Sequence, residues 1–384
     1  MLTTNLASKT AEKHLLRRLH AKLPDSVRYQ IDIASISLQD TLHNWHMPAY
    51  YVRSSLPDSN GEGTVLYFGD RSQYKSWTHT LFGHTIQPVS LGQFSLFQIL
   101  GGRHPELTAD IILCPLNPWT MPLFARRNWH IMPLYVDSYV DLRKPINELI
   151  TSSDAKRDLR VARRFDYRFE NVENDQALHE FFYKMLLPTV KSRYKERAFL
   201  PKLENIQHIY QNGVLIAAYL DDEWVGAHLL AIEGTDSIRS ANLGWRNGSN
   251  EWRKKGLVAA LYNQSFIWAQ ENGFIKLNMG SSQPFVNDGP LNFKLKWGAT
   301  MVPLKVRFVE GQVEGARSFI GAKFDLKSLA TQYFLATTPL LDCVDGKLRA
   351  INWNAEIPPQ FRRQIALGCE WVNLANTSGA ESSI

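Results

Sequence analysis

The clearest pattern of apolar and polar positions in this chain lies between residues 150 and 310. Over Gly256–Glu271, apolar residues recur every three or four positions, so that Leu257, Leu261 and Trp268 share one face. This period predicts an amphipathic helix, and Gly273 is typical of the position just beyond a helix end. We therefore expect a helix here that packs one face against a sheet.

The segments on either side of this helix predict a mixed order of helices and strands. Three apolar runs separated by the short polar stretches 221–223 and 234–236 predict an antiparallel meander. The expected elements are a helix at 155–164, a strand at 167–172, a long helix from Asn174 to near Pro188, a helix at 202–210, the meander strands 214–220, 224–233 and 237–243, a strand at 274–279, a helix near 290–296 and a strand at 301–309. The fold class that follows is α/β with a mixed sheet.

The first 140 residues carry weaker patterns and no motif with evident chemistry. The expected elements there are a basic amphipathic helix at Ala11–Leu23, strands at 64–68, 94–100 and 109–113, and a strand at 129–136 that leads into 139–150. His43 and His46 are three residues apart, but no carboxylate or cysteine at ligand spacing accompanies them. We interpret them as polar or packing residues and expect no metal.

Length and composition narrow the class of protein. The chain has 384 residues, of which 44% are hydrophobic and 21% charged, values typical of a globular protein with two domains. The three cysteines, Cys114, Cys343 and Cys369, are too few and too scattered for a disulfide framework, which favours a reducing compartment. No apolar run has the length of a signal peptide core or a transmembrane helix, so we expect a soluble, cytoplasmic protein.

The charge balance favours anionic partners without naming one. There are 43 basic and 37 acidic residues, a net charge of +6, which suits phosphorylated cofactors, nucleotides, RNA or acidic membrane surfaces. Arginine and lysine crowd the expected helix 155–164. Neither zinc ligands nor a helix-turn-helix pattern accompanies that helix, so a solvated or phosphate-steering face is the favoured interpretation over nucleic-acid recognition.

The element order and four segments together resemble a known family. The segments are DAKRDLRVARRF, VLIAAYLDDEWVGAHLLAIEG, RKKGLVAALYNQSFIWAQENGFIKLNMG and NDGPLNFKLKWGA. Over residues 154–309 the chain is similar to the FemAB-like branch of the GNAT superfamily of acyltransferases. This resemblance implies two tandem GNAT-like domains. We expect a diverged one at 1–140, and at 141–384 a GNAT/FemAB-like domain with a C-terminal extension.

The resemblance implies an acyl-CoA site at the loop before the helix 256–271. GNAT enzymes hold the pyrophosphate of the acyl donor on a (Gln/Arg)-x-x-Gly-x-(Gly/Ala) loop, whose backbone N–H groups are unpaired at a helix start. The matching residues here are Arg253, Lys254, Lys255, Gly256, Leu257 and Val258. Val258 departs from the small residue that is usual at that place. Gly256 is expected to let the pyrophosphate approach, so that Gly256→Val would obstruct the ligand and leave the core largely unaltered.

The same resemblance implies anion-binding residues. Many GNAT enzymes have a general-acid Tyr four residues before a Gly in the closing helix, but here Lys294 precedes Gly298 at that offset. The Phe293–Lys294 pair looks like the FemAB-like pattern, and Lys294 is expected to bind a phosphate or carboxylate. Arg193 and Arg197 resemble a recurrent arginine of this branch and are expected to clamp an anionic substrate. An exposed helix lysine and solvated loop cations are the alternatives.

Acyl transfer to an amine needs a group that accepts a proton. Asp288, in the Asn-Asp-Gly turn before the closing helix, and His228, in the middle of a meander strand, are the two candidates. Both have plain structural alternatives, since Asp is common in turns and a single strand histidine is more often structural than catalytic.

The sequence thus predicts an N-acyltransferase that moves an acyl group from acyl-CoA, or a similar thioester, to the amine of a small molecule. The second hypothesis is aminoacyl transfer from charged tRNA, which the FemAB resemblance permits. The third is a non-catalytic binding protein that has kept the fold, which the missing Tyr and Val258 keep open. We expect the N-terminal half to contribute acceptor specificity rather than donor binding.

Overall fold

The fold is described from a computed structural model that covers the chain in eight stretches. The described residues are 24–57, 61–102, 108–194, 200–303, 307–309, 312–314, 319–362 and 369–376. The expected helix at 11–23 and Arg197 lie outside them. Within these stretches, no helix combines the length and the apolar character needed to cross a membrane.

The chain divides into two compact units. The first unit consists of residues 1–134, 304–356 and 372–384, and the second of residues 135–303 and 357–371. The division expected from the sequence kept 141–384 together as one domain. In the structure, the segment from 304 to 356 folds with the N-terminal part instead, because its strand β15 (Phe319–Phe324) is hydrogen-bonded on both sides to strands of the first unit.

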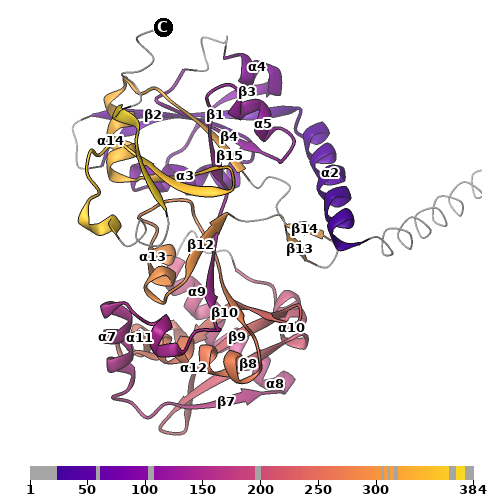
Figure 1. The fold of residues 1–384 in the computed structure, drawn as a ribbon, viewed down its shortest axis with the longest axis vertical. Helices are drawn as coiled ribbons and strands as arrows, with labels where there is room; N and C mark the ends of the chain where they lie inside the picture. The colour runs from indigo at the N-terminus through magenta and orange to yellow at the C-terminus, as the bar shows by residue number, and fades with distance from the viewer. Residues whose placement is uncertain are drawn as a thin grey trace, which may run out of the picture. The chain divides into compact units, whose positions relative to one another are not determined.

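The first unit is built on a six-stranded sheet with the order β3-β1-β2-β4-β15-β5. Its elements are α2 (Asp25–His43), β1 (His46–Ser55), β2 (Glu62–Phe68), α3 (Arg71–Phe82), β3 (Val89–Ser95), α4 (Leu96–Gly101), β4 (Ile111–Leu116), α5 (Met121–Ala125), β5 (His130–Pro133), β13 (Arg307–Val309), β14 (Gln312–Glu314), β15, α14 (Leu329–Thr337), β16 (Leu340–Val344), β17 (Lys347–Asn352) and the short helix η6 (Leu374–Asn376). Figure 1 shows the late-chain elements β15 and α14 among the indigo and violet strands of this unit.

Side chains alternate across this sheet and bury both of its faces. Leu66 and Phe68 of β2 join the cluster under α4 and α5, together with Ile99 and Phe124. Tyr67, between them on the strand, packs its ring against Tyr74 of α3. The expected strand 94–100 was wrong beyond Ser95, where α4 begins, because Ser95 and Gln98 form a reciprocal capping box that starts a helix.

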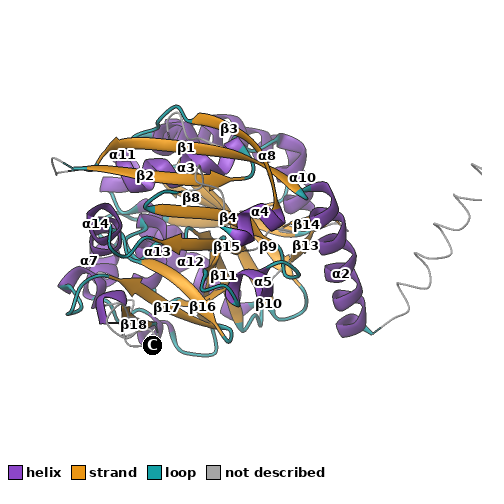
Figure 2. Cartoon of the chain, turned by 90° about the horizontal axis from the view of Figure 1, so that it is seen from above, coloured by secondary structure: helices purple, strands orange, loops and turns teal. Residues whose placement is uncertain are grey.

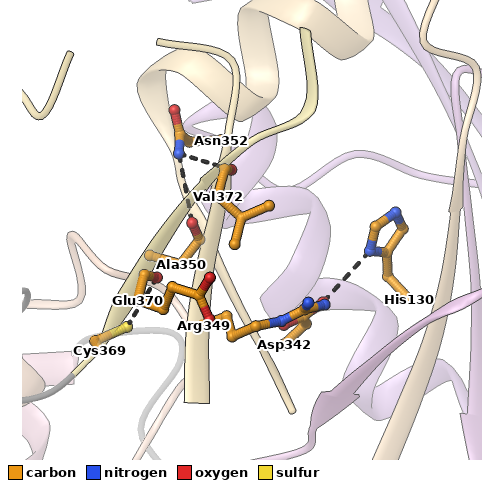
Figure 3. A network of polar contacts seen from close by, with 8 residues as sticks. All are labelled: His130, Asp342, Arg349, Ala350, Asn352, Cys369, Glu370 and Val372. Atoms are coloured by element: carbon orange, nitrogen blue, oxygen red, sulfur yellow. Dashed lines mark hydrogen bonds and ion pairs between the residues drawn. The ribbon is translucent and has the colours of Figure 1, made fainter. Parts of the chain in front are cut away.

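A buried carboxylate ties two strands of the first unit together. Asp342 of β16 is 1% exposed and accepts two hydrogen bonds from Arg349 of β17, at 2.9 and 2.7 Å. On its other side lies His130 of β5, with Nδ1 3.4 Å from Oδ2 of Asp342 (Figure 3). In the same view, Asn352 at the end of β17 donates to the carbonyl of Val372, in strand β18 (Glu370–Asn373), at 2.9 Å. The hairpin β16–β17 is thereby fixed to β5 by charge-assisted contacts.

The second unit is built on a seven-stranded sheet with the order β12-β6-β11-β10-β9-β8-β7. Its elements are β6 (Val136–Asp141), α6 (Ile146–Leu149), α7 (Ser153–Ala162), β7 (Arg168–Val172), α8 (Asp175–Glu180), the π-helix η2 (Phe181–Leu186), α9 (Leu187–Tyr194), α10 (Leu203–Gln211), β8 (Gly213–Leu220), β9 (Glu223–Glu233), β10 (Ser237–Trp245), the 3₁₀ turn η4 (Arg246–Gly248), α11 (Asn250–Lys254), α12 (Leu257–Glu271), β11 (Lys276–Ser282), α13 (Gly289–Lys296), β12 (Thr300–Pro303) and the 3₁₀ turn η5 (Pro359–Phe361). Figure 2 labels β8, β9, β10 and β11 of this sheet in orange, with helices such as α7 and α12 in purple.

Helices cover both faces of this sheet. Ile216 of β8 points to the cluster formed with α7, α12 and Trp297. Its neighbours Leu215 and Ala217 point to the opposite cluster, with η2 and Ile206 of α10. The order strand, helices, three antiparallel strands, helix, strand, helix, strand is the one that the sequence pattern predicted.

Two details of the second unit differ from the expectation. Strand β6 begins at Val136, which was expected to end the strand 129–136, and pairs with both β11 and β12. The helix from Asn174 does not stop at Pro188 but continues through η2 into α9. Pro188 directly follows the π-helical turn η2, where the regular i→i−4 hydrogen bonds are already interrupted, so its missing N–H costs the helix less.

Candidate active site

The central feature of the second unit is the place where strands β10 and β11 part. These parallel neighbours are paired over three residues, the last pair being Arg239 and Asn278. Beyond it, β10 remains paired with β9 as far as Trp245, whereas β11 is next paired with β6 on its other side, at Ser281. The ladder between the two central strands therefore opens along the second half of β10. We call this place the strand opening.

A chain of hydrogen bonds leads from α12 through β9 to the strand opening. His228 of β9 is fully buried, and its Nδ1 lies 2.8 Å from Oγ of Ser265 on α12. Its Nε2 lies 2.7 Å from Oγ of Ser240 on β10. The edge of the His228 ring also packs against Tyr262, with ring centroids 5.0 Å apart. Both ring nitrogens of the predicted catalytic histidine are thus occupied.

Burial keeps His228 neutral. Removal from water lowers the pKa of His228 to about 3, against a weaker opposing effect of a hydrogen bond to the Leu261 backbone. A base of such low pKa holds a proton poorly near neutral pH. The catalytic role of His228 stays a prediction, and its geometry favours a structural role in orienting Ser240.

Lys294 of α13 is buried and directed at the end of β11. Its side chain is 7% exposed, and Nζ donates to the carbonyls of Gly280 and Ser281 at 2.8 and 2.7 Å and lies 2.8 Å from Oγ of Ser282. An ammonium group has three donors, and these contacts can use all of them. Lys294 therefore shapes the backbone beside the strand opening, and its contact with a substrate anion stays a prediction.

Asp288 begins α13. One of its carboxylate oxygens accepts a hydrogen bond from the backbone N–H of Leu291 at 2.9 Å, which caps the helix. Burial raises the pKa of Asp288, and the Leu291 hydrogen bond and the charge of Lys294 act in the opposite direction. A carboxylate with a raised pKa is a better proton acceptor than an ordinary one.

Polar side chains of β6 and β11 line the other side of the parting strands. Asp137 is 2% exposed, and its carboxylate accepts from Oγ of Ser281 at 2.7 Å and from the Tyr139 hydroxyl at 3.3 Å. Asn278 is fully buried, and its Oδ1 accepts from the N–H of Gly280 at 2.8 Å. Its Nδ2 has no hydrogen-bond partner among the described residues. A buried donor in this position is typical of a place that a ligand or water completes.

The predicted phosphate loop lies at the start of α12. Arg253 and Lys254 are exposed, whereas Nζ of Lys255 is held 2.7 Å from Glu251 and 4.8 Å from the ring centre of Trp252. Leu257 is buried in the core, and Val258 packs partly buried beside it. The loop therefore offers two exposed cations and a helix start.

Gly256 has a structural reason to be glycine that the sequence did not show. Its φ is +80°, a left-handed conformation, and a Cβ placed there would lie 2.7 Å from the backbone nitrogen of Ala162 on α7. Gly256 thus permits close packing between α7 and α12. The Gly256→Val change would disturb the core, contrary to the expectation, because the backbone of Ala162 cannot move away like a flexible side chain.

Arg193 lies in the last turn of α9. It is exposed, and its guanidinium carbon is 6.0 Å from the ring centre of Trp245, the last residue of β10. This places it near the far end of the strand opening, as an anion-clamping role needs, although that role stays a prediction.

The first unit has a cavity of its own. A cavity of about 780 Å³ has Tyr51, Phe68 and Trp129 among its lining residues. Its charged lining residues are of both signs, namely Arg53, Lys323, Glu62, Asp110 and Asp325. This size suits a small organic ligand. Among the described residues of both units, no group of three or more His, Cys, Asp or Glu side chains is placed to hold a metal.

Sequence reasoning missed Ser240, Ser265, Asp137 and Asn278. Each lies on, or next to, a strand or helix that the sequence pattern predicted. Single Ser, Asp and Asn residues, however, carry no sequence signal that marks them as functional. The alternation along 274–279 separates Asn278 from the apolar side of its strand, which is the one available sign.

Comparisons with known proteins give resemblances in structure alone. No family profile matches the chain, and neither does any curated protein. Among solved structures, the C-terminal domain (DUF2156) of a putative lysylphosphatidylglycerol synthetase from Agrobacterium fabrum is 12% identical, with a TM-score of 0.36, and the match covers 74% of this chain and 82% of that one.

Two further structures complete the picture. FemX is 12% identical with a TM-score of 0.37, over 71% of this chain and 93% of its own. A GNAT family acetyltransferase from Elizabethkingia anophelis, solved with acetyl-CoA bound, is 13% identical with a TM-score of 0.27, over 41% of this chain and 95% of its own. The identities of 12–13% and TM-scores of 0.27–0.37 mark distant likenesses in fold.

Proposed function

We propose that the second unit transfers an acyl group from an acyl-CoA, or a similar thioester, to a substrate amine. The strand opening carries this proposal. Where two parallel strands separate inside a sheet, an extended ligand with amide groups can lie between them and pair with the exposed strand edge. The arm of coenzyme A is such a ligand, so the opening suits a donor whose thioester lies among the polar residues at its inner end.

The charged end of the donor would lie toward the start of α12. Backbone N–H groups at a helix start are unpaired, and the helix dipole favours negative charge there. Arg253 and Lys254 are exposed at that end, and neither forms an ion pair within the described part of the chain. These groups would hold the donor phosphates, and Arg193 would meet an anion at the far end of β10.

Asp288 is a better candidate than His228 for the group that accepts the amine proton. In the reaction, the neutral amine attacks the thioester carbonyl, a C–N bond forms, the C–S bond breaks, and the amine proton must leave. Asp288 has a raised pKa and lies close enough to Lys294 to feel its charge. His228 is buried with both nitrogens engaged. The cavity of the first unit is the place we propose for the acceptor specificity expected of that half.

The second candidate function is aminoacyl transfer from charged tRNA, and one observation favours it. Six exposed cations on α7, just after it and on α11 have no ion pair among the residues described, and they are Lys156, Arg160, Arg163, Arg164, Arg253 and Lys254. Gly256, which lies between α11 and α12, abuts Ala162 of α7. A group of unpaired cations of this kind suits a phosphate backbone.

Calorimetric titration with acetyl-CoA and longer acyl-CoAs tests the first proposal. We expect saturable binding that weakens in the double variant Arg253→Ser, Lys254→Ser, with the loss fading at high salt. The matched control is Lys327→Ser, Lys347→Ser, which removes two exposed lysines of the first unit. Absence of binding by every donor would overturn this proposal.

Titration of the same protein with unacylated tRNA distinguishes the acyl-CoA proposal from the tRNA proposal. Binding that falls steeply with salt, without acyl-CoA binding, would favour the aminoacyl route. Failure of both ligands would favour the non-catalytic binding protein.

A further inference from the structure

The hydrogen bonds that cross the second unit toward the strand opening run in one direction. They link the Leu261 carbonyl, Ser265, His228 and Ser240 in that order, at 2.7, 2.8 and 2.7 Å. Ser265 and His228 are fully buried, so water does not replace a partner within this chain. The order of donors and acceptors along it can therefore be worked out from the chemistry of its members.

The direction is set at the Leu261 end. A carbonyl oxygen can only accept, so the Ser265 hydroxyl donates its single hydrogen to Leu261. Oγ of Ser265 must then accept from Nδ1 of His228, which therefore carries the ring hydrogen. A neutral imidazole has one N–H, so Nε2 is left with a lone pair, and the Ser240 hydroxyl donates to it.

The neutral state of the ring supports this order. Burial lowers the pKa of His228 to about 3, so the second ring proton is absent near neutral pH. No ionised group makes a hydrogen bond with the ring in the described part of the unit. The ring contacts two hydroxyls, the Leu261 backbone and the Tyr262 ring, and a backbone carbonyl beside Nδ1 also favours hydrogen on that nitrogen. With one hydrogen for two ring nitrogens, the Leu261 carbonyl decides which of them holds it.

Ser240 stands at the inner end of the strand opening. It directly follows Arg239, the last residue of β10 that pairs with β11, and it precedes a shift in the β9–β10 register. Its side chain is half-buried, unlike that of His228. Across the opening lies Gly280, where a Cβ would be 3.8 Å from the Ser240 carbonyl oxygen and 4.0 Å from Nζ of Lys294.

We propose that Oγ of Ser240 is a fixed hydrogen-bond acceptor that selects an N–H group of the ligand in the strand opening. A serine hydroxyl usually can donate or accept, but here its hydrogen is committed to His228. The remaining lone pairs of Oγ therefore favour an amide or amine N–H over a carbonyl or ether oxygen. Ser240 is thereby a specificity-determining residue, and His228 and Ser265 are positioning residues that act through it. This inference rests on the proposed acyl transfer for the identity of the ligand.

Nitrogen NMR of protein labelled at histidine tests the direction without any ligand. We expect the His228 signal to be that of a neutral ring with hydrogen on Nδ1 and a lone pair on Nε2, unchanged from pH 8 to pH 5. The signal is assigned by its loss in His228→Gln. A ring with hydrogen on Nε2 would reverse the chain and overturn the proposal.

Titration with acetyl-CoA tests the ligand contact. Ser240→Ala should raise the acetyl-CoA Kd about fivefold, the effect of one hydrogen bond. Ser237→Ala, on the same strand where the ladder with β11 is intact, is the matched control and should leave it unchanged. An equal Kd for Ser240→Ala and the wild-type protein would overturn the contact.

The NMR measurement and the acetyl-CoA titration together distinguish a failure of this inference from a failure of the proposed function on which it rests. If no acyl-CoA binds to the wild-type protein, the proposed donor and the ligand contact both fail, and the NMR result still decides the direction of the chain. If acyl-CoA binds and the Ser240 change has no effect, the proposed function stands and this inference alone is overturned.

Discussion

Gly256 has two separate reasons to be glycine, a left-handed φ of +80° and a backbone atom of Ala162 at 2.7 Å from any Cβ. Gly256→Ala should therefore lower the free energy of unfolding by roughly 2–5 kcal/mol, the sum of backbone strain and overpacking. Gly273→Ala is the control, because Gly273 has a φ of +79° with nothing within 4 Å of its Cβ position. Urea unfolding measures both. Equal losses would mean that the contact with Ala162 contributes nothing.

His228 makes stability depend on pH. Its folded pKa of about 3 lies below the ordinary 6.5, so the unfolded chain takes up a proton that the folded chain refuses. Below pH 6.5, its contribution to the free energy of unfolding should fall by about 1.4 kcal/mol per pH unit until pH 3 is approached. The difference between wild type and His228→Gln, followed by urea unfolding from pH 7.5 to 5, isolates this effect. A difference that does not change with pH would contradict the burial of a neutral ring.

At the scale of elements, the hairpin β16–β17 depends on one carboxylate. Burial alone would raise the pKa of Asp342, but the hydrogen bonds from His130 and Arg349 outweigh it and lower the pKa. The stabilisation is therefore present above the ordinary pKa of 3.8 and is lost as pH falls below it. Asp342→Asn should cost about 1–3 kcal/mol at pH 7, and less in acid.

Asp345→Asn provides the control for this change. Asp345 lies in the turn of the same hairpin with a φ of 49°, a conformation that Asn tolerates well. Thermal unfolding at pH 7 and pH 3 compares the two variants. If Asp345→Asn were as destabilising as Asp342→Asn, the contacts of Asp342 with His130 and Arg349 would not be the cause.

The elements that could be predicted from the sequence are those with a local signal. The helix α12 and the meander β8–β10 were predicted because their periodicity and turns lie within one stretch of chain. Strand β6 was not, since it is a strand by virtue of pairing with β11 and β12, which come more than a hundred residues later. The same holds for β15, whose partners β4 and β5 precede it by about two hundred residues.

The residues of the candidate site also differ in whether a local sequence signal could reveal them. Family resemblance pointed to Lys294 and the start of α12, and the need for a proton acceptor pointed to Asp288 and His228. Ser240 and Ser265 could not be found, because they meet His228 only through the register of β9 with β10 and the packing of α12. Gly256 was placed correctly at the helix start but for a different physical reason, since the neighbour that demands glycine is on α7.

At the scale of the whole molecule, the first unit is discontinuous. Strand β15 lies between β4 and β5, so β5 is joined to its sheet through a segment that follows residues 135–303 of the second unit in the sequence. A chain that ends at residue 303 should therefore unfold at a lower temperature and expose apolar surface of the first unit. Calorimetry and dye binding measure this. A chain that ends at residue 376 is the control and should behave like the full protein, and equal stability of the two would show that β5 does not need β15.

Because residues 135–303 interrupt the first unit in the sequence, the two sheets are completed at different times during synthesis. A ribosome makes the chain from residue 1, and every strand of the seven-stranded sheet, from β6 to β12, has been synthesised by residue 303. The six-stranded sheet lacks an inner strand until β15 ends at Phe324. The part of the protein that is made first is therefore the last to complete its sheet. During that interval the newborn chain carries β4 and β5 with unpaired edges, which is when a chaperone would have most to protect.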